Sequence, residues 1–184
     1  MTSLGTIEQT GDTHTLRYER RLEHPVEKVW AALTEPDELR GWLAAAEELE
    51  LREGGVVALR WLNVPDDTKE WEEKGVEIPE DHDISAPVRG TITRLDPPRL
   101  VEYETDQMGL LRWELRGDEN GCVLTFTNVI ELPEGHPPEQ MLAGWHVHLD
   151  ALEEALEGRP ADWENWTELH MDEWAAVREQ YAAR

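Results

Sequence analysis

Hydrophobic and polar residues alternate near the start of the chain, over residues 14–24. On one side of this stretch lie Leu16, Tyr18 and Leu22, and on the other lie Arg17, Glu19 and Arg21. A period of two residues predicts a half-buried strand. Arg20 falls on the apolar side, and we expect it at an edge of the sheet, paired with a nearby acid.

A helical pattern follows this strand. The apolar residues of one helical face are Val26, Val29, Trp30 and Leu33. After this helix the chain restarts at Pro36, a residue suited to the first turn of a helix. We therefore predict a second short helix, which ends near Gly41.

Three pairs of strands fill the middle of the chain, over residues 49–64, 86–105 and 109–132. Each pair turns at a short segment of glycine, proline or acidic residues, at 53–55, 96–98 and 118–121. In the last pair, Leu111, Trp113 and Leu115 alternate with Arg112, Glu114 and Arg116. The pattern predicts an antiparallel meander with one face in solvent.

The segment 138–158 has the period of a helix, because apolar residues recur at spacings of three and four until Gly158. It carries His146 and His148, which resemble a metal motif in the written sequence. Residues two apart on a helix point about 200° apart, so the two rings cannot hold one metal ion. We predict no metal site, and we place His146 and Asp150 together on the solvated face.

Two polar residues share faces with apolar neighbours. His148 lies beside Trp145 and Leu149, either as a core histidine with a satisfied hydrogen bond or as a polar anchor in a cavity. Asn128 shares a strand face with Phe126 and is either buried or exposed at an edge. The sequence leaves both alternatives open.

Two segments lie outside the sheet pattern. Residues 65–83 form an acidic insertion, which we predict to be a mobile, solvated loop with one helical turn. The tail, residues 161–183, carries tryptophans at helical spacing and predicts an amphipathic helix with Asp162 as its N-cap. We expect residues 1–184 to form a single domain with its core at residues 14–158.

The charge balance excludes several classes of partner. The chain has 41 acidic residues against 17 lysines and arginines, a net charge of −24. Such a surface repels phosphate backbones and anionic lipids, so we expect no nucleic-acid and no membrane partner. The single cysteine, Cys122, cannot form an internal disulfide. With no signal-peptide pattern and no long apolar run, we expect a cytoplasmic protein.

The nine tryptophans, against one phenylalanine, place large side chains at the interior positions of several elements. They either fill the core or line an apolar cavity, and the sequence cannot distinguish a filled interior from a hollow one. We find no nucleophile elbow, no glycine-rich phosphate loop and no histidine partner for Cys122. Nothing in the sequence demands an enzyme, and we expect no cofactor.

Three stretches carry a family resemblance. "ERRLEHPVEKVWAALTEPDELRGWL" (residues 19–43), "LREGGVV" (51–57) and "GWHVHLDALEEALEGRP" (144–160) resemble the bacterial branch related to the activator of the heat-shock-protein-90 ATPase. That branch belongs to the SRPBCC superfamily of START-like, or helix-grip, proteins. The resemblance covers residues 16–158. The acidic insertion departs from the short connection usual in the family.

The resemblance implies an α+β helix-grip fold, in which a curved antiparallel sheet wraps around a long C-terminal helix. It also implies a deep cavity between that helix and the sheet. On this basis the expected ligand-binding residues are Trp42, Trp61, Tyr103, Trp113, Trp145, His148 and Leu149. The expected ligand is a small apolar molecule, similar to a lipid or a polyketide.

Three functions follow from this resemblance. We favour non-catalytic binding of a small hydrophobic molecule. The alternatives are a chaperone-associated adaptor and a cyclase- or hydrolase-like enzyme that uses the same cavity. The eukaryotic activator has a further N-terminal domain, for which we expect no room in this chain. The sequence leaves open whether the protein forms a homodimer.

Overall fold

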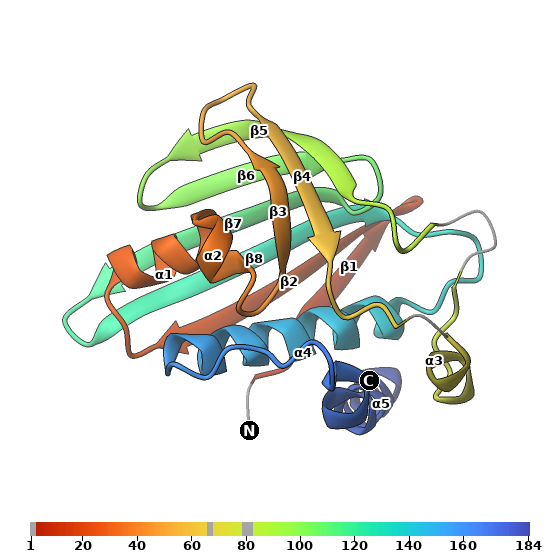
Figure 1. The fold of residues 1–184 in the computed structure, drawn as a ribbon. Coiled ribbons are helices and arrows are strands. Elements are labelled where there is room, and N and C mark those ends of the chain that lie inside the picture. The colour runs from red at the N-terminus through yellow and green to blue at the C-terminus, as the bar shows by residue number, and fades with distance from the viewer. Residues whose placement is uncertain (1–2, 66–67, 79–82) are drawn as a thin grey trace.

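The computed structural model describes residues 3–65, 68–78 and 83–184. Within these ranges the chain forms one sheet of eight antiparallel strands, in the order β1-β2-β8-β7-β6-β5-β4-β3 (Figure 1). The strands are β1 (Thr6–Thr10), β2 (Thr13–Leu22), β3 (Ala44–Leu49), β4 (Val56–Trp61), β5 (Val88–Asp96), β6 (Leu100–Thr105), β7 (Gly109–Asp118) and β8 (Gly121–Glu131). The helices are α1 (Val26–Thr34), α2 (Pro36–Leu39), α3 (Lys69–Glu73), α4 (Pro138–Leu156) and α5 (Trp166–Ala182).

The predicted α+β helix-grip fold is confirmed. The strand near the start of the chain, the two short helices, the last two hairpins and the long helix form where the patterns place them. The first hairpin forms too, but its first strand, β3, lies at Ala44–Leu49, mostly before the predicted range of 49–64. Strand β1 was not predicted, because its residues are mostly exposed and show no apolar alternation. It pairs with β2 and forms one edge of the sheet. No helix in the described ranges is long and apolar enough to cross a membrane.

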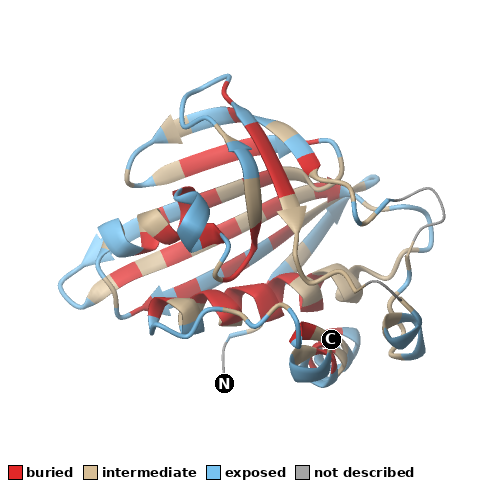
Figure 2. Ribbon diagram, viewed as in Figure 1, coloured by how far each residue is buried: buried red, intermediate tan, exposed pale blue. Residues whose placement is uncertain are grey.

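The sheet curves around α4, and the buried residues of both elements face each other (Figure 2). At the centre of this interface, the Trp113 ring stacks on Phe126 with their centroids 3.9 Å apart. Trp42 meets the Trp113 ring edge-on at 5.6 Å, and Trp145 meets it at 6.0 Å. Aromatic rings therefore fill the space between the middle of the sheet and α4.

The polar atoms of these buried side chains have partners. Trp113 Nε1 donates to the Tyr103 hydroxyl at 3.1 Å, and Trp42 Nε1 donates to the Ala32 carbonyl at 2.8 Å. Burial raises the pKa of Tyr103 to about 12, so its hydroxyl stays protonated. Asn128 is fully buried and accepts a hydrogen bond from Trp145 Nε1 at 3.1 Å. The aromatic rings of this core are packed against one another, and their polar atoms are hydrogen-bonded.

We predict that Trp113→Ala lowers the free energy of unfolding by about 3–5 kcal/mol, because the truncation empties a packed aromatic site. Chemical denaturation measures the loss. Glu114→Ala is the control, since Glu114 lies next to Trp113 on β7 but is exposed. Equal effects of the two substitutions would contradict a filled core around Trp113.

Candidate functional site

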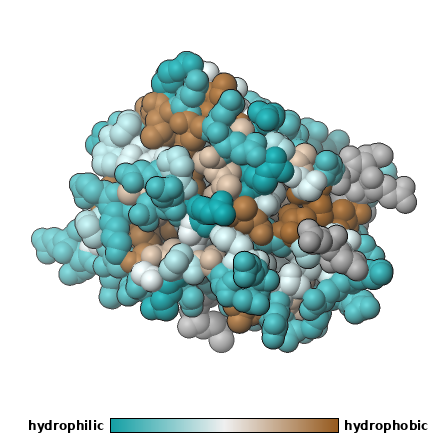
Figure 3. Space-filling model, viewed as in Figure 1, coloured by the Kyte–Doolittle hydropathy of each residue, from teal (hydrophilic) through white to brown (hydrophobic). Residues whose placement is uncertain are grey.

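A cavity of about 360 Å³ lies beside the first half of α4. Its other walls come from α5, from the segment around α3, from the end of β4, from the β6–β7 turn and from the end of β8 with the segment that follows it. The aromatic and methionine residues that line it are Trp61, Trp71, Trp145, Trp166, Trp174, Met108, Met141 and Met171. Figure 3 shows an apolar area at the surface on the side of the molecule where α3 lies. The site thus lies at the edge of the interface between the sheet and α4.

The structure separates the seven predicted ligand-binding residues into two groups. Trp61, Trp145 and His148 line the cavity. Trp42, Tyr103, Trp113 and Leu149 are not among its lining residues, and all four are buried in the core. Between the middle of the sheet and the long helix, where the resemblance implied a cavity, the rings of Trp42, Trp113 and Phe126 pack against one another.

The acidic insertion helps to build the site. Trp71 Nε1, on α3, donates to Thr167 Oγ1 at 3.2 Å, and Arg178 donates to the Gly75 carbonyl at 2.7 Å. Glu77 and Gln140 exchange two hydrogen bonds, at 2.8 and 2.9 Å. The predicted helical turn is present as α3, and none of residues 71–78 is buried, but this part of the predicted loop is tied by hydrogen bonds to α4 and α5. Residues 66–67 and 79–82 of the predicted loop lie outside the described residues.

His148 is held firmly at the edge of the cavity. Its Nδ1 lies 3.0 Å from the carbonyl oxygen of Trp42, and only 7% of the residue is exposed. Its ring stacks on Trp166 with the centroids 5.1 Å apart. Burial lowers the pKa of His148 to about 4, so the ring is neutral near pH 7. His148 therefore combines the two predicted roles: it is a core histidine with a hydrogen-bond partner, and it also lines the cavity.

The other ionisable residues of the lining are His136, His170, Glu77 and Glu131. Burial lowers the pKa of His136 from its usual value. His170 lies 3.4 Å from Glu173. Among the described residues that line the cavity there is no lysine and no arginine.

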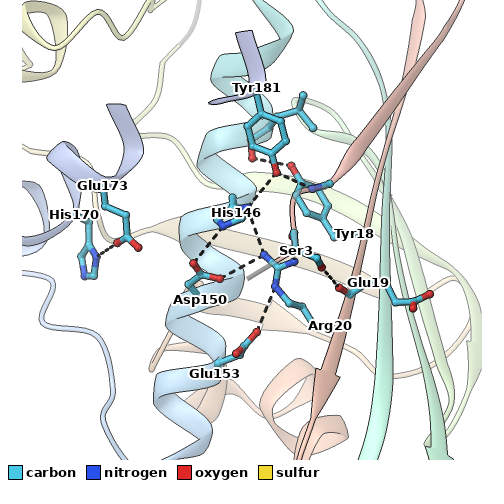
Figure 4. Close-up of polar contacts among 12 residues, drawn as sticks. Ser3, Tyr18, Glu19, Arg20, His146, Asp150, Glu153, His170, Glu173 and Tyr181 are labelled. Carbon is cyan, nitrogen blue, oxygen red and sulfur yellow. Dashed lines mark hydrogen bonds and ion pairs between the residues drawn. The ribbon is translucent and has the colours of Figure 1, made fainter. Parts of the chain in front are cut away.

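Helix α5 is fixed by a buried polar cluster on a second face of α4 (Figure 4). The Arg20 guanidinium, on β2, reaches Asp150 at 3.4 Å and Glu153 at 3.3 Å. His146 places Nε2 at 3.4 Å from Asp150 and Nδ1 at 3.1 Å from the Tyr181 hydroxyl, on α5. Burial raises the pKa of Glu153, while Arg20 opposes that shift.

This cluster corrects two predictions. His146 was placed on a solvated face, but it is buried because α5 covers that side of α4. Arg20 does pair with nearby acids, as predicted, but it lies on β2, which β1 and β8 flank on both sides. The helix period assigns a residue to a face of α4, and it does not show that a later helix covers that face.

The two ends of the described chain meet beside this cluster. Gly5 N donates to the Tyr181 hydroxyl at 2.8 Å, and Arg184 donates to the Gly5 carbonyl at 3.1 Å. At its other end, α5 begins later than predicted, at Trp166. Asp162 is not its N-cap: the Asp162 carboxylate accepts hydrogen bonds from the backbone N and from Nδ2 of Asn165 instead.

His146 and His148 contact different residues, near opposite ends of α5. His146 faces Tyr181, and His148 faces Trp42 and Trp166. Within the ranges that the structure describes, no group of three or more histidine, cysteine, aspartate or glutamate residues is arranged to hold a metal ion.

Residues 23–157 match the family described as activator of Hsp90 ATPase homolog 1-like proteins. The match covers most of the chain, and the chain belongs to this family. Helix α5 lies beyond the matched residues. No functionally curated protein sequence matches the chain.

Solved structures show the same fold. A conserved protein of unknown function from Enterococcus faecalis is 17% identical, with a TM-score of 0.66, and the match covers 97% of this chain and 90% of that one. An AHSA1-like protein from Aeromonas hydrophila is 22% identical, with a TM-score of 0.57, over 78% of this chain and 92% of that one. CalU16 from Micromonospora echinospora is 21% identical, with a TM-score of 0.52, over 95% of each chain.

Several lining residues were not predicted from the sequence. Trp166, Trp174 and Met171 lie on one side of α5, and their spacing was a visible signal for a helix face. The sequence did not show that this face meets α4 across a gap. Trp71 stood in an acidic segment, where a single aromatic residue gave no periodic pattern.

We predict that burial of His148 makes the protein less stable as the pH falls. The folded-state pKa is about 4 against an ordinary 6.5, so the unfolded chain binds more protons between these values. From about pH 7 to about pH 5.5, wild type should lose about 1 kcal/mol more stability than His148→Phe. Chemical denaturation of both proteins at each pH measures this difference. Both proteins have the same carboxylates, so the contributions of these groups to the pH dependence cancel. Parallel pH dependences would contradict a neutral, buried His148.

Proposed function

We propose that this protein binds a small, largely apolar molecule in the cavity between α4, α5 and the segment around α3. The observation that carries this proposal is the cavity itself, with about 360 Å³ of space and a lining rich in tryptophan and methionine. Small-molecule sites are typically concave, of at least about 300 Å³, and mostly apolar with a few polar groups. Here His148, His170 and Gln140 are among those polar groups.

The lining supports binding rather than covalent catalysis. Among the described residues that line the cavity there is no serine, threonine or cysteine, so no hydroxyl or thiol nucleophile is present there. The free Cys122 lies in the core cluster, and burial raises the pKa of its thiol, which leaves the thiol unreactive. Binding without chemistry is the function that this geometry supports best.

The position of the cavity supports a ligand that is enclosed by α5. This helix supplies Trp166, Trp174 and Met171, and the neighbouring α3 adds Trp71. Both helices are joined across the rim by Trp71–Thr167 and Arg178–Gly75 hydrogen bonds and by the Lys74–Asp172 ion pair.

We predict that an apolar compound selected by calorimetry from a broad panel raises the stability of the wild type. At a hundredfold excess over Kd the gain should be about 2.7 kcal/mol, because the ligand binds only the folded state. Trp71→Ala should remain folded, since Trp71 is only half-buried, and should weaken binding by about tenfold.

The matched control is Trp30→Ala, which removes a half-buried tryptophan on α1, away from the cavity. It should leave the dissociation constant unchanged. If no compound of the panel binds, or if both substitutions weaken binding equally, the proposed function is wrong.

A further inference from the structure

The cavity contains one hydrogen-bond acceptor whose orientation is fixed by the core. The Trp42 carbonyl can only accept a hydrogen bond, so His148 Nδ1, at 3.0 Å, must carry the proton that is donated to it. A neutral imidazole has a single N–H, which leaves Nε2 as an acceptor with a free lone pair. No hydrogen bond to Nε2 is present among the described residues, although the side chain is more than nine-tenths buried.

The surroundings of His148 keep this acceptor in place. Its ring stacks on Trp166 at 5.1 Å with an interplanar angle of 20°, and it lies 5.5 Å from the Trp61 ring. Because Nδ1 is bound to the core on one side of the ring, Nε2 lies at the opposite side, where the ring borders the cavity. Nε2 is not one of the buried side-chain atoms that lack a partner, so this acceptor is accessible, and a ligand hydroxyl group in the cavity can donate to it.

Charge narrows the class of ligand further. The described lining has no lysine or arginine, and it includes the carboxylates of Glu77 and Glu131. An anionic ligand, such as a fatty acid, would find no cation to pair with and would be repelled. The indole rings of Trp61, Trp145 and Trp166 offer flat surfaces, which suit an aromatic ring.

We propose that the site selects an uncharged aromatic alcohol, whose hydroxyl group donates a hydrogen bond to His148 Nε2. This proposal rests on the proposed function and adds the chemical class of the ligand. A site that hydrogen-bonds a hydroxyl group discriminates against the analogue that lacks it, because that analogue covers the acceptor without donating to it. His148 is on this account the residue that determines specificity.

The test uses three probes that share one ring system: β-naphthol, its methyl ether and naphthoate. Isothermal titration calorimetry on the wild type should show naphthol binding about tenfold more tightly than the ether, and naphthoate binding most weakly. In His148→Phe the preference for naphthol should disappear while the ether still binds. His24→Phe is the control, because His24 lies outside the cavity and should leave the preference unchanged.

A second measurement does not depend on any variant. Nitrogen-15 NMR of the histidine rings in the wild type should show His148 with a proton on Nδ1 and none on Nε2. Naphthol should shift the Nε2 signal, and the ether should not. If naphthol and ether bind equally, or if naphthoate binds best, the proposed ligand class is wrong and the cavity proposal stands. If none of the probes and no other apolar compound binds, both proposals fail.

Discussion

The burial of Arg20 is the constraint on which the position of α5 depends. A guanidinium that is 3% exposed is costly unless carboxylates compensate it, and Asp150 and Glu153 on α4 supply that compensation. His146 extends the cluster from Asp150 to the Tyr181 hydroxyl, so that α5 closes over polar groups that would otherwise face solvent. Because Tyr181 fixes one end of α5, the face that carries Trp166, Met171 and Trp174 is held towards the cavity.

The packed core and the proposed binding cavity thus lie in different parts of the molecule. Between the middle of the sheet and α4, the rings of Trp42, Trp113 and Phe126 pack against one another. The cavity opens farther along, where α4 leaves the sheet and meets α5 and the acidic insertion. The family match ends at residue 157, and the lining residues Trp166, His170, Met171 and Trp174 come from a helix beyond the matched region. The shared fold supplies the walls from α4, the end of β4, the β6–β7 turn and the end of β8, and α5 and the insertion complete the site.

The sequence predicted the fold well, because apolar periodicity reports which face of a strand or helix is buried. It predicted Trp61, Trp145 and His148 at the site but could not separate them from Trp42 and Trp113, since all of these are interior aromatic positions. The packing of α5 and of the acidic insertion decides which interior positions border the cavity. The contact between α4 and α5, which the sequence pattern does not show, also explains why His146, predicted on a solvated face, is buried. Strand β1 had no apolar alternation to indicate it.

Methionine methyl NMR tests the location of the binding site most directly. Met108, Met141 and Met171 line the cavity from the β6–β7 turn, α4 and α5, respectively. In protein labelled with carbon-13 at the methionine methyls, a bound ligand should shift all three signals with one common dissociation constant. Binding that leaves these three signals in place, while the ring signals of Trp113 and Tyr103 move, would place the ligand between the sheet and α4 and contradict this account.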